Sequence, residues 1–337
     1  MTPDPIRAIA DAVLYEGYIL WPYRRSALKN QRRFTFGGVY PPAHSAAHPD
    51  DLATVQAEVL LLGGGDVAVE IGVRFLHVVA RTVARLRDGQ LEPVDELALG
   101  DERHVAWDEA VERDVHAPAL TLRQLRTGHR VPIAIPAGSE REQLVNQAGV
   151  PAGALIRTWK ELRGELSVHA TALSGGVWRV RARIANLTAF SDSAREQALK
   201  QTFCSAHALL RTPAGRFVSP ADPPESLAGA ASACRNVGLW PVLVGEQDDH
   251  TTMLASPIIL EDHPRIAPES PGDLFDGGEI DQLLILNILS LTDEEKAEMA
   301  ASDPRTREIL ERTEALTPEQ LMALHGTVRE FGMARLT

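Results

Sequence analysis

The residues of this sequence that could bind or react are concentrated near its beginning. All four tyrosines fall between residues 14 and 40, where five cations stand among them against the single acid Glu16. Aromatic rings beside arginine and lysine form stacking and cation–π surfaces for a partner chain, a nucleotide or another planar ligand. The same composition suits an internal belt in which arginine stems pack on aromatic rings. The residues that we expect to contact a partner or ligand are Tyr15, Glu16, Tyr18, Trp21, Tyr23, Arg24 and Lys29.

A second set of polar residues could hold a divalent metal. Acidic side chains are dense between residues 261 and 281, and oxygen-rich clusters suit Mg²⁺ or Ca²⁺. Their spacing is not that of an EF-hand loop, and a solvated loop or a helix cap explains many of them. Cys204 and His207 would share a face only on a helix, because a strand points them to opposite sides. The candidate polar site comprises His207, Asp262, His263, Glu269 and Asp273.

The sequence has no motif that indicates a particular reaction. It contains no G-x-S-x-G and no dinucleotide-binding fingerprint. Three glycines at 63–65 precede a strand-like segment rather than a helix, so the geometry of a phosphate-binding loop is missing. We therefore predict no catalytic residue, and the sequence favours a protein that is not an enzyme.

The elements that must position these residues are predominantly strands. Apolar and polar residues alternate over 55–61 and 67–75, on both sides of the three glycines, which predicts a hairpin. A second hairpin is predicted over 166–184, with Trp178, Val180, Ala182 and Ile184 on one face. Arg179, Arg181 and Arg183 lie on the other face, which is either solvated or a docking surface for an acidic partner. Residues 240–262 read as a third hairpin.

Helices are predicted mainly at the C-terminal end. Residues 5–13 and 192–203 read as short helices, Ser139 with Gln143 as a helix start, and LLILNILSLT as buried strand or helix. Thr292 with Glu295 forms a capping-box pattern, and Pro304 follows Asp303 at a first-turn position. The predicted fold class is α+β and β-rich, with several antiparallel hairpins in a sandwich- or barrel-like arrangement and a C-terminal helical tail.

Length, charge and cysteine content narrow the class of protein. A chain of 337 residues predicts one composite domain or two packed regions, 1–219 with the aromatic–basic segment and 220–337 with the acidic loop and C-terminal helices. A net charge of −12 argues against nucleic-acid binding. No apolar run of membrane-spanning length and no secretory signal are present, so we expect no membrane insertion. Two cysteines fit a reducing cytoplasm.

Three segments together are similar to an uncharacterised bacterial family that occurs in operons for uptake [NiFe]-hydrogenases. They are LYEGYILWPYRRSALKNQRRFTFG (14–37), SPIILEDHPRIAPESPGDLFDGGEID (256–281) and LTDEEKAEMAASDPRTREILERTEALTPEQLMALHG (291–326). They lie toward both ends of the chain, so the resemblance covers nearly its full length.

The resemblance implies a non-catalytic, cytoplasmic accessory protein for [NiFe]-hydrogenase assembly or maturation. Its partner would be a hydrogenase subunit or a maturation factor, bound by protein contact and without a cofactor. One alternative is a metal-binding enzyme or metallochaperone that uses the candidate polar site with a divalent metal. Another is a small-ligand or nucleotide-binding module at 14–40.

Overall fold

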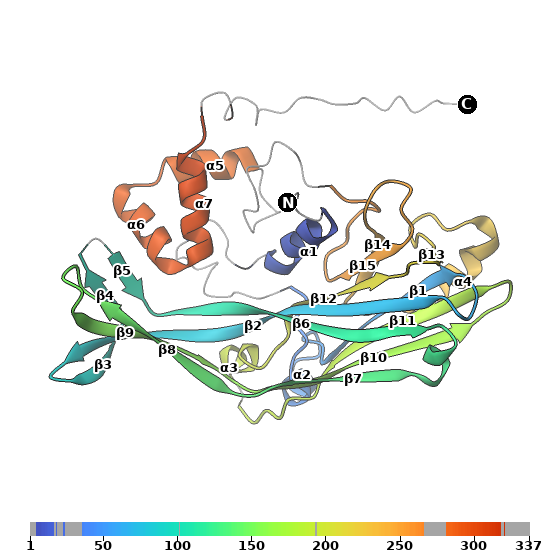
Figure 1. The fold of residues 1–337 in the computed structure, drawn as a ribbon, viewed down its shortest axis with the longest axis horizontal. Helices are drawn as coiled ribbons and strands as arrows, with labels where there is room; N and C mark the ends of the chain where they lie inside the picture. The colour runs from blue at the N-terminus through green and yellow to red at the C-terminus, as the bar shows by residue number, and fades with distance from the viewer. Residues whose placement is uncertain are drawn as a thin grey trace.

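The computed structural model describes residues 5–16, 18, 23, 36–100, 102–192, 194–265, 281–317 and 320 (Figure 1). The protein is β-rich and built from antiparallel sheets with several helices at its C-terminal end, which confirms the predicted α+β class. One sheet has five strands in the order β13-β1-β11-β10-β7. Their bounds are β1 Thr54–Leu62, β7 His129–Ile135, β10 Leu162–Ala172, β11 Val177–Asn186 and β13 Arg216–Phe217.

The other large sheet has eight strands and contains the longest strand of the described chain. Its strands are β2 Ala68–Arg87, β3 Gln90–Val94, β6 Trp107–Thr121, β8 Gly138–Val145, β9 Pro151–Trp159, β12 Cys204–Arg211, β14 Trp240–Leu243 and β15 Thr252–Ser256. A separate two-stranded ribbon is made by β4 Glu96–Leu99 and β5 Glu102–Val105.

The main core lies between the two large sheets, which pack as a sandwich. Alternate side chains of both sheets, such as Val59 and Val180 on one and Ile71 and Phe75 on the other, meet in a single buried cluster. The predicted hairpin over 166–184 is confirmed as the antiparallel pair β10–β11. Its apolar residues face this core, so the arginines between them project from the outer face of the five-stranded sheet.

The predicted hairpin around the three glycines is wrong in its pairing. Both strands exist, but β1 pairs with β11 and β13, whereas β2 pairs with β3, β6, β9 and β12. The glycine turn therefore carries the chain from one sheet to the other, and the two strands face each other across the core. Alternation reveals which face of a strand is buried, but a strand paired beside its neighbour and one packed opposite it give the same pattern.

Strand β2 is central to the eight-stranded sheet because each of its two edges pairs with two different strands, one after the other along its length. On one edge β6 pairs with residues 68–81 and β3 with residues 83–87. On the other edge β12 pairs as far as Leu76, and β9 begins at Ala80. Residues 77–79 therefore lie at the point where β12 and β9 diverge.

The structure also shows whether two further segments, 138–145 and 283–292, form a strand or a helix. Residues 138–145, read as a helix start at Ser139, instead form the edge strand β8, which pairs with β9. The ambiguous run LLILNILSLT begins within a helix, α5. The third predicted hairpin is confirmed as the pair β14–β15.

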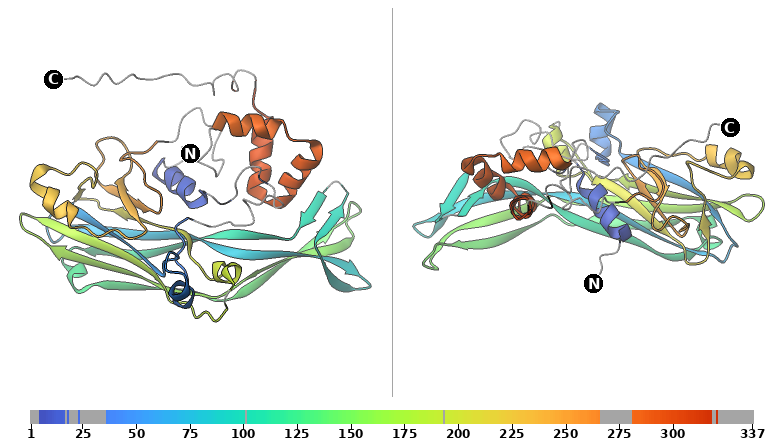
Figure 2. Two further views of the ribbon diagram at one scale, coloured as in Figure 1. Left: turned by 180° about the vertical axis from the view of Figure 1, so that it is seen from behind. Right: turned by 90° about the horizontal axis from the view of Figure 1, so that it is seen from above.

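The helices lie mostly on one side of the eight-stranded sheet. Figures 1 and 2 show α1 beside β12 and the group α5–α7 toward the end of the molecule that carries β4 and β5. Ile9 and Val13 of α1 pack against Val242, Val244 and Leu254 of the sheet region. The helices are α1 Pro5–Tyr15, α2 Pro42–Ala47, α3 Arg195–Leu199, α4 Ala228–Ser232, α5 Asp281–Leu289, α6 Asp293–Ser302 and α7 Pro304–Glu314, with short 3₁₀ turns η2 Gln124–Thr127 and η3 Glu225–Leu227.

The predicted caps of the C-terminal helices are present. Thr292 and Glu295 make both bonds of a capping box at the start of α6. Asp303 caps α7 by accepting a hydrogen bond from the Arg305 backbone, and Pro304 occupies the first turn. Local sequence therefore fixes where these helices begin.

Strands from both sides of residue 220 share one sheet, since β15 pairs with β12. The region 220–256 is thus built into the same sandwich as the region before it. No helix among the described residues has the length and apolar character needed to cross a membrane.

Candidate functional site

Polar side chains from five elements meet on the helix-covered side of the eight-stranded sheet. The strand register sets this arrangement, because His207 of β12 is the cross-strand partner of Arg74 on β2, and Arg74 is the partner of Asp114 on β6. Cross-strand partners point to the same face of a sheet. Helix α1 adds two residues and α7 adds one. We call this group the polar junction; its members are Asp11, Tyr15, Arg74, Glu112, Asp114, His207 and Arg305.

Arg74 is the centre of the polar junction. Its guanidinium lies 2.6 Å from Asp11, 3.0 Å from Glu112 and 2.9 Å from Asp114 at the nearest atoms. The Arg74 side chain is only 9% exposed, whereas the three carboxylates are 33–43% exposed. One buried cation thus holds three partly solvated carboxylates.

Tyr15 links α1 to this group and to α7. Its hydroxyl donates to Glu112 Oε1 at 2.7 Å and accepts from Arg305, whose guanidinium carbon lies 4.1 Å from the centre of the Tyr15 ring. Three residues later, the hydroxyl of buried Tyr18 donates to Asp303 Oδ2 at 2.7 Å. Because Asp303 also caps α7, the tyrosines of the N-terminal segment fasten the first turn of that helix.

Burial and hydrogen bonding fix the protonation states in the polar junction. Burial raises the pKa of Tyr15 far above its usual range, and the bond to Glu112 adds to this. Burial would also raise the pKa of Glu112, but the bond from Tyr15 and the Arg74 charge outweigh it and lower that pKa. Burial lowers the pKa of His207 to about 4. At neutral pH the phenol and imidazole are therefore neutral, and Glu112 and Arg74 are charged.

This chemistry favours anchoring over catalysis. A phenol with a raised pKa is a poor base, and the neutral imidazole bonds through Nδ1 to the Ser205 carbonyl at 3.2 Å. The two arginines of the polar junction pair with its three carboxylates, so most of its charge is compensated internally. What the polar junction does is hold α1 and α7 against β2, β6 and β12.

A second buried arginine, Arg81 of β2, attaches the C-terminal end of helix α6 to the eight-stranded sheet. Arg81 donates to the Ser302 carbonyl at the end of α6 at 2.8 Å, to the Val105 carbonyl at 3.1 Å and to Glu109 Oε1 at 2.7 Å. A guanidinium at a helix C-terminus satisfies carbonyls that have no partner within the helix.

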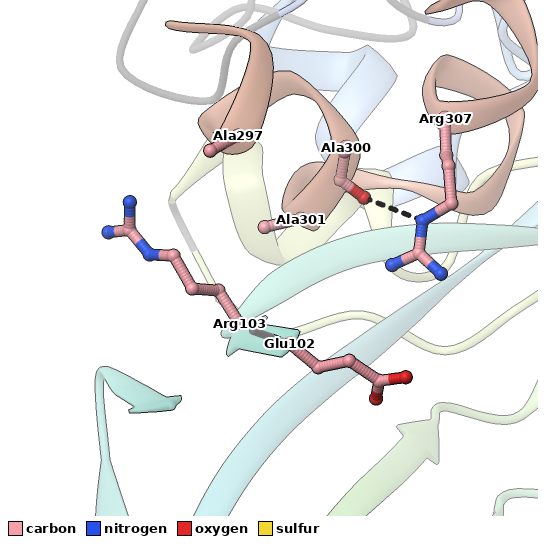
Figure 3. Close-up of a pocket in the computed structure, with 6 residues that line it drawn as sticks. All are labelled: Glu102, Arg103, Ala297, Ala300, Ala301 and Arg307. Carbon is pink, nitrogen blue, oxygen red and sulfur yellow. Dashed lines mark hydrogen bonds between the residues drawn. The ribbon is translucent and has the colours of Figure 1, made fainter. Parts of the chain in front are cut away.

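A shallow cavity lies beside this attachment. Figure 3 shows its lining from β5, α6 and α7, with Arg307 donating to the Ala300 carbonyl. Its volume is about 200 Å³, and its lining is Glu102, Arg103, Ala297, Ala300, Ala301 and Arg307. Pockets for drug-sized ligands span roughly 300–1,000 Å³ and are mainly apolar. This cavity is smaller, and charged residues form half of its lining.

The residues predicted to contact a partner at the N-terminal segment divide into two groups. Tyr15, Tyr18 and Tyr23 are buried, with at most 5% exposure, so their rings form part of the interior rather than an accessible surface. Glu16 is half-buried. The other three, Trp21, Arg24 and Lys29, lie outside the described residues, and their role stays a prediction.

The structure does not bring the described members of the candidate polar site into one group. His207 belongs to the polar junction, whereas Asp262 accepts hydrogen bonds from Ser219 and from the Leu243 backbone, and the His263 backbone donates to the Leu243 carbonyl at 2.7 Å. In the part of the chain that the structure describes, no group of three or more His, Cys, Asp or Glu side chains is arranged to hold a metal. Glu269 and Asp273 lie outside the described residues.

Sequence reasoning missed the residues that connect its two candidate sets. Tyr15 and His207 meet through Arg74 and Glu112, which were not singled out. A signal exists in residues 107–121, where acids recur beside valine and alanine, but that stretch was not recognised as a strand paired with β2.

Comparison with known proteins adds no family to this description. No protein-family model matches the chain, and no curated protein is significantly similar to it.

Proposed function

We propose that this chain is a non-catalytic accessory protein that acts in the cytoplasm by contact with another protein, a [NiFe]-hydrogenase subunit or maturation factor. The resemblance of three segments to a hydrogenase-associated family supports the choice of partner. The structural observation that carries the contact itself is the basic outer face of the five-stranded sheet.

This face concentrates arginine in an acidic protein. Residues that alternate with the buried positions of the five strands point outward, and among them only two are acids, Glu58 and Glu165. The outward cations are Arg130, Arg163, Arg179, Arg181, Arg183 and Arg216. Six positive charges against two negative ones stand out in a chain of net charge −12.

Half of these arginines have an ion-pair partner within the protein. Arg163 lies 2.7 Å from Glu161, Arg130 lies 3.6 Å from Glu165, and Arg179 lies 4.0 Å from Glu58. Arg181 is exposed, and neither it nor Arg183 has an ion-pair partner among the described residues. Arginine forks bind carboxylates in pairs of parallel hydrogen bonds, which fits an acidic protein surface.

A protein partner fits this face better than a nucleic acid does. The net charge of −12 repels a polyanion such as a nucleic acid at long range. Tight binding of a nucleic-acid backbone also requires many cations arranged along the path of its phosphates. A sheet face with a short row of arginines instead matches a local patch of carboxylates, and we expect this association to weaken as the salt concentration rises.

The experiment is a pull-down from cells that express the hydrogenase, with the full chain as bait, combined with deletion of its gene. We expect a hydrogenase subunit or maturation factor among the captured proteins, and reduced hydrogenase activity in the deletion strain. Recovery of no hydrogenase component, together with unchanged activity, would contradict the proposal.

A further inference from the structure

The arginines of β11 form a regularly spaced row on the outer face of the five-stranded sheet. Arg179, Arg181 and Arg183 alternate with Val180 and Ala182, which are buried in the core between the two sheets. Because a strand rises about 3.3–3.4 Å per residue, alternate residues on one face lie about 6.6–6.8 Å apart. The row therefore places three guanidinium groups along one line of the surface at a spacing fixed by the strand.

Two of these three arginines have no carboxylate to compensate their charge. Arg183 donates to the neutral Thr54 hydroxyl at 3.2 Å, and Arg181 has no ion-pair partner among the described residues. Glu58, the residue opposite Arg181 on β1, instead accepts a hydrogen bond from a nearby backbone N–H at 2.9 Å and lies 4.0 Å from Arg179. Arginine forks bind carboxylates well, so the row fits carboxylates supplied by another molecule.

The neighbouring strands add hydrogen-bond donors beside the row. Ser167 of β10 lies opposite Arg183, and Arg130 of β7 lies opposite Ser167. His169 of β10 lies opposite Arg181. On the β10 side, both unpaired arginines therefore have a polar neighbour that is not an acid, and an acidic segment lying along β11 meets no repulsion there.

We propose that the occupant of this row is an extended segment of the partner protein that carries Asp or Glu at every second residue. In an extended chain, alternate side chains point to the same side and repeat about every 6.6–6.8 Å, so three carboxylates meet the three arginines in register. An extended segment also has the same right-handed twist as β11. This inference rests on the proposed function, because it takes the basic face as the docking surface.

An acidic helix fits the row less well. Side chains four residues apart on a helix are separated by about 6 Å along its axis, which is close to the spacing of the arginines. Each such step also turns the side chain by about 40° around the axis, because 3.6 residues complete one turn. The third carboxylate has then turned by about 80° from the first and no longer points toward the sheet.

The test measures binding of the full-length protein to fluorescein-labelled synthetic peptides by fluorescence anisotropy at low ionic strength. One peptide has three aspartates at every second position, one has the same composition with its aspartates adjacent, and one is a helix-forming peptide with three aspartates at every fourth position. We expect the alternating peptide to bind at least about tenfold more tightly than the other two, because only it places a carboxylate on each arginine.

Charge reversal locates the peptide on the row. R181E and R183E should each weaken binding of the alternating peptide at least about tenfold. R87E changes an exposed arginine at the far end of β2 and should bind as the wild type does. The comparison of the three peptides uses wild-type protein, so it gives an answer even where a variant does not fold.

The assignment would be overturned by equal affinity for the alternating and adjacent peptides, by tighter binding of the helical peptide, by no binding of any peptide, or by equal losses in R181E and R87E. Any of these results together with capture of a hydrogenase component in the pull-down would reject the extended segment and leave the proposed function standing. Preference for the alternating peptide with an empty pull-down would retain the segment and reject the hydrogenase as its source.

Discussion

Replacing Arg74 by methionine should destabilise the protein strongly at neutral pH. The hydrogen bond from Arg74 to Glu112 is charge-assisted and worth about 1.5–3 kcal/mol, and the pairs with half-exposed Asp11 and Asp114 are worth about 0.2–1 kcal/mol each. Together they give about 2–5 kcal/mol, and the substitution also leaves three carboxylates facing one another. Arg7 is the matched control, since it is 59% exposed and lies 3.9–4.0 Å from two of the same carboxylates. Arg7→Met should cost less than about 1 kcal/mol.

The stability lost in Arg74→Met should depend on pH, in a direction set by the lowered pKa of Glu112. Glu112 has a lowered pKa in the folded protein, so its contribution to stability is present above its ordinary value of 4.5 and is lost as pH falls through the folded value. The difference between wild type and Arg74→Met should therefore be largest at pH 7 and smaller at pH 4, as measured by urea unfolding monitored by circular dichroism. A loss no larger than that of Arg7→Met, or a loss equal at both pH values, would refute the idea that Arg74 centres a partly buried charge network.

Three further predictions concern the anchoring of the helices and the core. Tyr18→Phe removes a donor from the buried Asp303 carboxylate and should cost about 1–3 kcal/mol in urea unfolding; an unchanged midpoint would show that the bond is replaced by water. The pKa of His207 falls from 6.5 to about 4 on folding, so the free energy of unfolding should decrease as pH drops from 6.5 to 4. His207→Phe should make the free energy of unfolding less dependent on pH in this range. The same pH dependence in the variant and the wild type would show that His207 does not cause it. Gly164→Ala would place a Cβ 2.5 Å from the buried ring of Phe203 and should lower stability by about 1–3 kcal/mol, as measured by thermal unfolding. Gly64→Ala is the control: a Cβ there would have nothing within 4 Å, so its stability in the same measurement should be nearly unchanged.

Local patterns predicted the elements of this fold better than their pairing. Alternation correctly located β10 and β11, and the capping residues Thr292 and Asp303 correctly located the starts of α6 and α7, because these signals act within a few residues. The pairing of β1 with β11 joins positions more than a hundred residues apart, and no local feature records it.

The polar junction could not be predicted for the same reason. It exists only because the register places His207, Arg74 and Asp114 in one row, and because α7 brings Arg305 to Tyr15. The aromatic–basic composition around residues 14–40 was a correct sign that the segment is unusual. For Tyr15 and Tyr18 the physical cause is hydrogen bonding to the partly exposed Glu112 and to the buried Asp303, which composition alone could not distinguish from ligand binding.

The most direct test of the proposed contact compares two charge-reversal variants as baits in the pull-down. Arg163 and Arg181 are exposed on the basic face, and Arg87 is exposed at the far end of β2. The account predicts that the double variant R163E/R181E recovers at least about tenfold less of the hydrogenase component than wild type, because like charges across an interface repel, and that R87E recovers as much as wild type. Equal recovery by the double variant and R87E would contradict the claim that the basic face of the five-stranded sheet binds the partner.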